Sequence, residues 1–363
     1  MNRAVLLRLP PEELRQSGEV DEYGAAAVAF WRSKPGATVD ELIDLVAKEA
    51  ATLLDRNGVH QPDVGKGAVK QQSTLAFFQA HSWSITVDVL KMTAAASQPG
   101  LTPASKMSEL KVDAVAELAS NIYHEFRHAE QSFLSARVTA EEAGRKLSPR
   151  ELADELDIPL DVADAAIGAA GTRLPDKLKA QAKAWRTFQH GGRHLGYKQW
   201  NDALSAGLAL FNSTVKWDDL GAKGPGLVQV NWERFLHPVI DPTFRRNYSF
   251  KADKLLRDLK AGPHEPVDSD VEKALTDTSS KLFMFLAKER GGAKLATPDA
   301  IAKMDPVDAK MAQLGEQIWV QELHLALLDA KQAAEEAYRA YPEEADAYQT
   351  GDLVKASIKE KGT

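Results

Sequence analysis

Apolar residues recur every three or four positions between Lys111 and Glu142, the spacing that places them on one face of an α-helix. No Pro or Gly interrupts this stretch, so the pattern predicts a single long helix. The apolar positions are Val112, Val115, Leu118, Ile122, Phe126, Phe133 and Leu134.

Much of the remaining chain has the same helical period. Thr38 and Glu41 have the spacing of a capping box before an amphipathic stretch, and Asn57-Gly58 is a signal for its end. Further helices are predicted over residues 12–16, 21–31, 148–156, 158–167, 268–290 and about 308–338. Residues 200–270 mix Trp with Gly and Pro and predict an irregular segment, and the charged tail, 355–363, is predicted to fray.

One stretch alternates instead. From Ser82 to Val87, the apolar residues Trp83, Ile85 and Val87 alternate with small polar residues, which predicts a β-strand. Residues 75–79 are a candidate partner strand, and 58–73 and 94–105 have loop composition. An exposed edge strand just before the long helix can hold an extended peptide, whereas a half-buried strand would only support the core; both interpretations stay open.

Composition narrows the function classes. The chain has 363 residues, 44% of them hydrophobic and 27% charged, as in folded globular proteins. A net charge of −7 argues against a general nucleic-acid-binding surface, so no nucleic-acid partner is expected. Since the chain has no Cys, any metal site must use His, Asp or Glu.

No apolar run approaches the length of a membrane span, so no membrane-spanning segment is expected. The first ten residues are too short and too charged for a secretory signal. We therefore expect synthesis in the cytoplasm, and export by a dedicated injection machine is an alternative that would leave no such signal.

The long helix contains His124, Glu125 and His128 in the order H-E-x-x-H. Residues four apart lie one helical turn apart on one face, so both imidazoles can reach one ion while Glu125 projects beside it. A carboxylate in that place can take a proton from a metal-activated water. The simpler alternative is a solvated helix face that carries two histidines by chance, and the metal interpretation is favoured over it.

Two other motifs are weaker indications of a functional site. Residues 148–167 have the outline of a helix-turn-helix, but Asp161 and Asp164 on the second helix disfavour DNA binding. His190 and His194 are also four apart, but the two glycines between them favour a loop over a second metal site.

A catalytic zinc site needs a third protein ligand. Pro342 can start a helix with Glu343, Glu344 and Asp346 in its first turn, although acidic residues also stabilise a helix N-terminus without any metal.

The two motifs together, His-Glu-Phe-Arg-His-Ala-Glu-Gln and the later Tyr-x-x-x-Pro-x-Glu-x-Asp-Ala, resemble zincin metallopeptidases of the gluzincin kind. The resemblance is to bacterial and phage-associated domains that pair H-E-x-x-H-A-x-Q with a P-x-E-x-x-A helix. It implies Zn²⁺ as cofactor, with His124, His128 and Glu344 as ligands and Glu125 as general base. It also implies that the strand with Trp83, Ile85 and Val87 is the substrate's edge strand.

The resemblance implies a zinc peptidase acting on a protein or peptide substrate. Candidates for stabilising the oxyanion or contacting substrate are Tyr338, Tyr341, Tyr348, Arg127 and His194. Gln131 is expected either to orient a ligand or to pack. Two alternatives stay open: a catalytically silent zincin-like interaction or effector module, and an injected protease toxin associated with a secretion or injection system.

The expected fold is mainly α, of the α+β kind, with a zincin-like metal helix, a small β-sheet and a large helical insertion. The predicted divisions are an N-terminal helical region (1–69), the strand with the H-E-x-x-H helix (70–144), a helical or irregular insertion or lid (145–305), and C-terminal helices with the third ligand (306–363).

Overall fold

The computed structural model describes residues 14–69, 74–144, 147–190 and 341–363, with a few isolated positions between 303 and 339. The chain divides into two compact units, one formed by Met1–Gly191 with Pro342–Thr363 and the other by Gly192–Tyr341. The first unit contains nearly all of the described residues. The predicted helices within 200–338 lie outside the described residues, and the four-part division stays a prediction.

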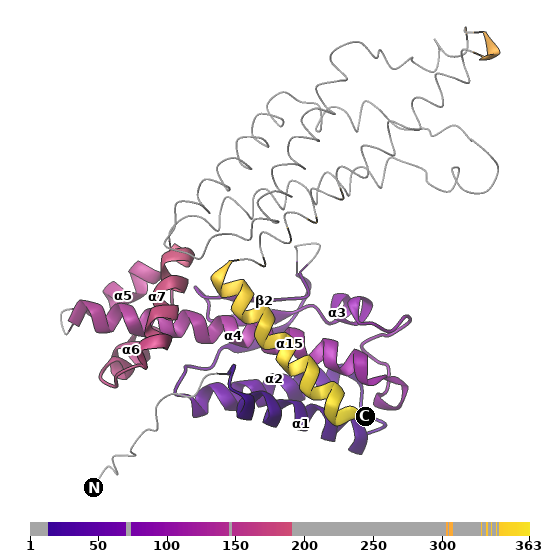
Figure 1. The fold of residues 1–363 in the computed structure, drawn as a ribbon, viewed down its shortest axis with the longest axis horizontal. Helices are drawn as coiled ribbons and strands as arrows, with labels where there is room; N and C mark the ends of the chain where they lie inside the picture. The colour runs from indigo at the N-terminus through magenta and orange to yellow at the C-terminus, as the bar shows by residue number, and fades with distance from the viewer. Residues whose placement is uncertain are drawn as a thin grey trace. The chain divides into compact units, whose positions relative to one another are not determined.

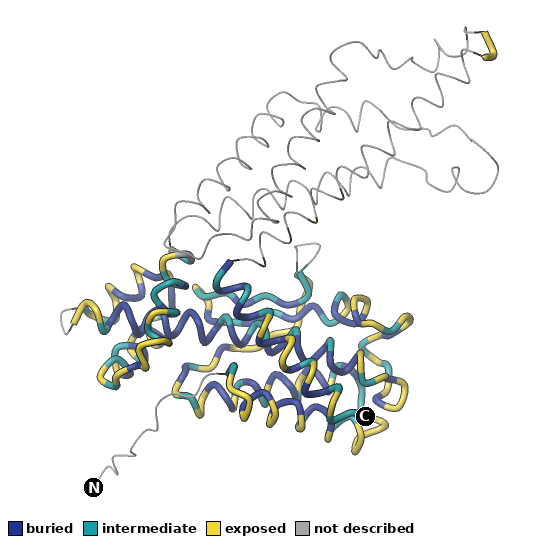
Figure 2. Tube along the Cα trace, in the orientation of Figure 1, coloured by how far each residue is buried: buried dark blue, intermediate teal, exposed yellow. Residues whose placement is uncertain are grey.

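The first unit is built around α4 (Val112–Ala143), the long helix that the hydrophobic period predicts. Figure 2 shows this helix buried along most of its length. Helices α1 (Ser17–Ser33) and α2 (Val39–Arg56) pack on it, and α2 begins with the predicted capping box of Thr38 and Glu41. The expected fold class is confirmed: the protein is mainly helical with a small three-stranded mixed sheet.

Three further helices gather at the C-terminal end of α4: α5 (Pro149–Leu156), α6 (Leu160–Ala170) and α7 (Asp176–His190), as Figure 1 shows. Leu134 and Val138 of α4 form a small separate core there with Trp185 and other apolar residues of the α7 region. The predicted capping box of Ser148 and Glu151 begins α5. None of the helices in the described ranges is long and apolar enough to cross a bilayer.

The order of the strands shows that the predicted strand lies in the middle of the sheet and not at its edge. Strand β3 (Ser84–Val87) is central, with β1 (Asp63–Lys66) parallel on one side and β2 (Ala76–Gln79) antiparallel on the other. Ile85 and Val87 are buried as the alternation predicts, but Trp83 lies in the preceding turn with a positive φ of 47°. Because β3 is paired on both sides, the prediction that Trp83, Ile85 and Val87 form an edge strand for substrate is wrong. Among the described strands β1 and β2 are at the edges, and β2 is the one that packs on α4.

The last helix, α15 (Pro342–Gly362), packs on α4 and α1. The prediction of a frayed tail is wrong, because Val354 and Ile358 have no exposed surface. Lys355 pairs with Glu117 of α4, and other lysines of α15 form similar ion pairs. The charged residues that suggested a solvated end are thus the polar side of a docked helix.

Glycine permits the close approach of these helices. A Cβ at Gly351 of α15 would lie 3.4 Å from the backbone oxygen of Ser120 and 4.0 Å from the Cβ of His124. A Cβ at Gly24 of α1 would meet the Oγ of Ser357 at 2.8 Å. The middle of α15 therefore lies close to α4 at the level of His124.

If α15 contributes to the core, Ile358→Ala should lower the free energy of unfolding by about 2–4 kcal/mol, the cost of a cavity in place of a buried aliphatic side chain. Leu353→Ala is the matched control, because Leu353 lies on the same helix and is 45% exposed. Urea denaturation followed by circular dichroism measures both. Equal, small effects of the two changes would show that the tail does not dock.

Candidate metal centre

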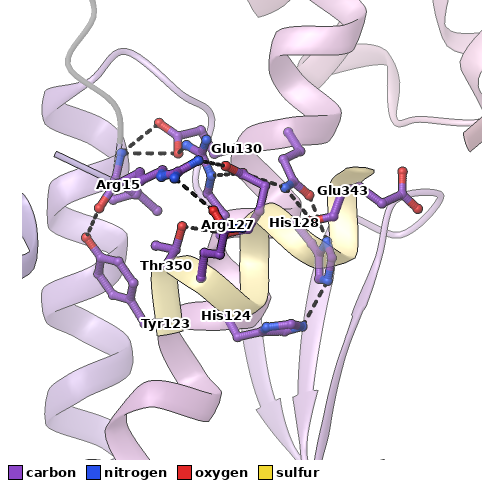
Figure 3. Close-up of polar contacts among 12 residues, drawn as sticks. Arg15, Tyr123, His124, Arg127, His128, Glu130, Glu343 and Thr350 are labelled. Carbon is purple, nitrogen blue, oxygen red and sulfur yellow. Dashed lines mark hydrogen bonds and ion pairs between the residues drawn. The ribbon is translucent and has the colours of Figure 1, made fainter. Parts of the chain in front are cut away.

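Helix α4 presents His124 and His128 on one face, with their Nε2 atoms 3.1 Å apart. Glu344 comes from the first turn of α15, which Pro342 begins as predicted. One carboxylate oxygen of Glu344, Oε2, lies 3.5 Å from the Nε2 of His124 and 3.4 Å from that of His128. The structure thus brings together the three side chains expected as metal ligands, in a group that could hold a metal ion. Figure 3 shows the two imidazoles side by side.

The shape of this triangle fits a tetrahedral ion. Zinc bonds to nitrogen and oxygen of about 2.0–2.1 Å place tetrahedral ligand atoms about 3.3–3.4 Å apart. The three separations here, 3.1, 3.4 and 3.5 Å, scatter closely around that value. These three atoms could hold such an ion, whose fourth ligand would be water or substrate.

His128 and Glu344 attract each other as opposite charges when no metal is bound. Burial lowers the pKa of His128, but the carboxylates of Glu344, Glu125 and Glu343 outweigh it and raise that pKa to about 10. Burial raises the pKa of Glu344, yet His128 and His124 outweigh it and hold the pKa well below its usual range. The metal-free pair is therefore imidazolium and carboxylate, and a cation can take the place of the proton.

Glu125 projects from α4 toward strand β2. Its Oε2 accepts the backbone N–H of Phe78 at 2.8 Å, so the strand fixes one carboxylate oxygen. Burial raises the pKa of Glu125, and the neighbouring imidazoles offset only part of the rise. A carboxylate with a raised pKa is a better proton acceptor than an ordinary surface glutamate.

The outer contacts of the two histidines differ. The Nδ1 of His128 lies 2.8 Å from the Oε1 of Gln131, one turn further along α4. The ring of His124 instead packs edge-on against Tyr348 of α15, with 4.6 Å between ring centroids. Gln131 is thus next to a ligand, as one of its two expected roles requires.

The five residues predicted to stabilise an oxyanion or contact substrate do not all lie at the site. Tyr348 lies beside the site and is half-buried, Tyr341 is buried, and Tyr338 and His194 lie outside the described residues. Arg127 was expected among them, and that prediction is wrong. Its guanidinium has no exposed surface and pairs with Asp346 at 2.7 Å and with Glu130.

Sequence reasoning missed two contributors to the site. The contact of the Phe78 N–H with Glu125 could be recognised only from the pairing of the strands, because no side-chain pattern indicates which backbone N–H points away from the sheet. Asp346 was noted only as an acidic residue of the first turn, whereas the structure buries it between Arg127 and Gln131. Arg127 lies between the two motif histidines in the sequence, but nothing in that spacing indicated that it would be buried and pair with Asp346.

No protein-family model, curated protein or solved structure matches this chain. The chemistry assigned to the site therefore depends on the motif and its geometry alone.

The metal-free protein provides a direct test of these electrostatics. We expect the His128 imidazole to titrate at about pH 10 in the chelator-treated protein, followed by NMR of its ring protons. Because that pKa exceeds the ordinary value of 6.5, the charged form stabilises the fold fully below pH 6.5, and this stabilisation is lost as pH rises through 10. Glu344→Gln should lower the pKa of His128 substantially. A wild-type titration near 6.5 would contradict the arrangement.

Proposed function

We propose that this protein is a zinc-dependent metallopeptidase. The observation that supports it best is that both histidines of H-E-x-x-H and a glutamate from a distant helix present three ligand atoms at tetrahedral spacing, with Glu125 beside them. Three N and O ligands with no Cys are the donor set of catalytic zinc sites in such peptidases. Zinc bound there would polarise a carbonyl and lower the pKa of a water molecule toward neutrality.

The residues of the site would have separate roles in this reaction. Glu125 is the general base: one carboxylate oxygen is held by the Phe78 N–H, and the carboxylate can accept a proton and pass it to the leaving amine. His124, His128 and Glu344 would hold the ion, with Nε2 of each imidazole and Oε2 of the carboxylate nearest one another. Tyr348, in contact with the His124 ring, is the described tyrosine best placed to approach a developing oxyanion.

Strand β2 supplies a place for an extended substrate. Because the Asp88 N–H donates to the Leu75 carbonyl, alternation along the antiparallel pair directs the backbone groups of Ala76 and Phe78 away from β3. The same strand packs on α4, which carries the motif. The Phe78 N–H already donates to Glu125, so a peptide would pair with the other outward groups of this edge, the Ala76 N–H and the carbonyls of Ala76 and Phe78, and would pass beside Glu125.

The decisive experiment separates metal binding from catalysis. Glu125→Gln should reduce peptide hydrolysis by about 10³-fold or more, because the proton acceptor is lost, while the zinc content stays near one per chain. Activity on a peptide library, with mass spectrometry of the products, measures the first, and atomic emission measures the second. The activity of the wild type should vanish with a chelator and return with zinc.

A catalytically silent module would bind zinc but cleave nothing in the library, in wild type and variant alike. Loss of zinc in Glu125→Gln would instead show that Glu125 is a ligand and not the base.

A further inference from the structure

A buried glutamine of α4, Gln131, connects the imidazole of His128 to the first turn of α15. Gln131, fully buried, donates through Nε2 to the backbone carbonyl of Glu343 at 2.9 Å and to Oδ2 of Asp346 at 2.9 Å. Its other end, Oε1, lies 2.8 Å from the Nδ1 of His128. Figure 3 labels the two ends of this chain of contacts, Glu343 of α15 and His128 of α4.

The two partners of Nε2 fix the orientation of the amide. A backbone carbonyl and a carboxylate only accept hydrogen bonds, so the NH₂ end of Gln131 must face them. The amide oxygen therefore faces His128, and the imidazole must donate to it through Nδ1–H. The tautomer with its proton on Nδ1 leaves the lone pair of Nε2 for the ion.

Asp346 is itself held from several sides. Its Oδ2 also accepts from Nε of Arg127 at 2.7 Å, and its Oδ1 accepts from Nη1 of Arg15 at 2.9 Å. Arg127 is fully buried, pairs with Glu130, and lies 5.3 Å from the centroid of the Trp185 ring. Because Asp346 follows Glu344 by two residues on α15, the same contacts fix the helical turn that carries the third ligand.

We infer that Gln131 and Asp346 are positioning residues of the metal centre: Asp346 orients the Gln131 amide, Gln131 holds the Nδ1–H of His128, and both fix α15 where Glu344 reaches the ion. This inference rests on the proposed function, since it concerns the same ion. It assigns roles to two side chains that touch neither metal nor substrate, and it explains why a buried arginine lies inside the motif.

A purely structural role for the pair predicts lower stability without any change at the ion, so the test needs a spectroscopic readout. Cobalt(II) substitutes for zinc and shifts the ring N–H protons of bound imidazoles far from other NMR signals. In the cobalt-loaded wild type, the His128 Nδ1–H should exchange slowly with solvent, because it is buried and bonded to Gln131. In Gln131→Leu this signal should exchange rapidly, and cobalt affinity should fall about 10–100-fold.

Two variants control for stability. Gln131→Glu keeps an oxygen facing His128 and, when protonated, still donates to Asp346, so it should recover slow N–H exchange and most of the affinity. Ser135→Ala removes a buried hydroxyl that donates to the backbone carbonyl of Gln131, one turn earlier on α4. It leaves the Gln131 amide side chain in place, so both readouts should stay at wild-type values.

The outcomes separate the two claims. A wild-type protein that takes up no cobalt overturns the proposed function. Cobalt uptake with an unchanged affinity and N–H signal in Gln131→Leu overturns the positioning role alone, and so does a wild-type spectrum in which the cobalt is bound through Nδ1 of His128. The wild-type spectrum decides the tautomer even if Gln131→Leu does not fold.

Discussion

The docking of α15 against α4 is the contact on which the rest of the structure depends. It buries the ion pair of Arg127 and Asp346, whose partners are 219 positions apart in the chain. Arg127 also pairs with Glu130, so the docking of α15 adds the carboxylate of Asp346 to the acidic surroundings of this buried guanidinium. The glycine at 351 lets the backbones approach at the level of His124, so the same fit delivers Glu344 to the histidine pair.

This arrangement makes the candidate metal centre a product of tertiary structure and not of the motif alone. The histidines are prepositioned by one helical turn, but the third carboxylate arrives only when the last helix of the chain has joined the first unit. Long-range contacts of this kind form at a high cost in loop-closure entropy, so they are expected late in folding. A bound ion would add its own free energy to this last step, since it bridges the two helices directly.

Local sequence signals predicted the elements that depend on local physics. The period of α4, the capping boxes of α2 and α5, and the proline at the start of α15 are all properties of short segments, and all appear as expected. The H-E-x-x-H spacing and Glu344 were also identifiable, the latter through a resemblance to known motifs. The pairing of the strands was not identifiable: the four residues of Asp63–Lys66 lie at the surface and show no apolar alternation, so nothing in the sequence revealed the strand that makes β3 central.

The positions of several charged residues were the second feature that the sequence did not predict. Arg127 was interpreted as substrate-facing and the lysines of α15 as solvent-facing. Arg127 pairs with Glu130 three residues on, but its other partner, Asp346, and the partner of Lys355, Glu117, lie more than 200 positions away. The burial of Arg127 and the docking of the tail follow from those distant pairs, and no short window of sequence contains both partners. The order of the strands and the identity of the ion pairs therefore required the structure.

The central claim is that two imidazoles of α4 and one carboxylate of α15 hold a single ion. Zinc content after dialysis, with X-ray absorption at the zinc edge, tests it most directly for the wild type, Glu344→Gln and the adjacent control Glu343→Gln. We predict one zinc per chain in the wild type and in Glu343→Gln, with two imidazoles and only N and O ligands at about 2.0–2.1 Å, and loss of zinc in Glu344→Gln. Equal retention of zinc in both variants, or a wild type that holds none, would contradict the account.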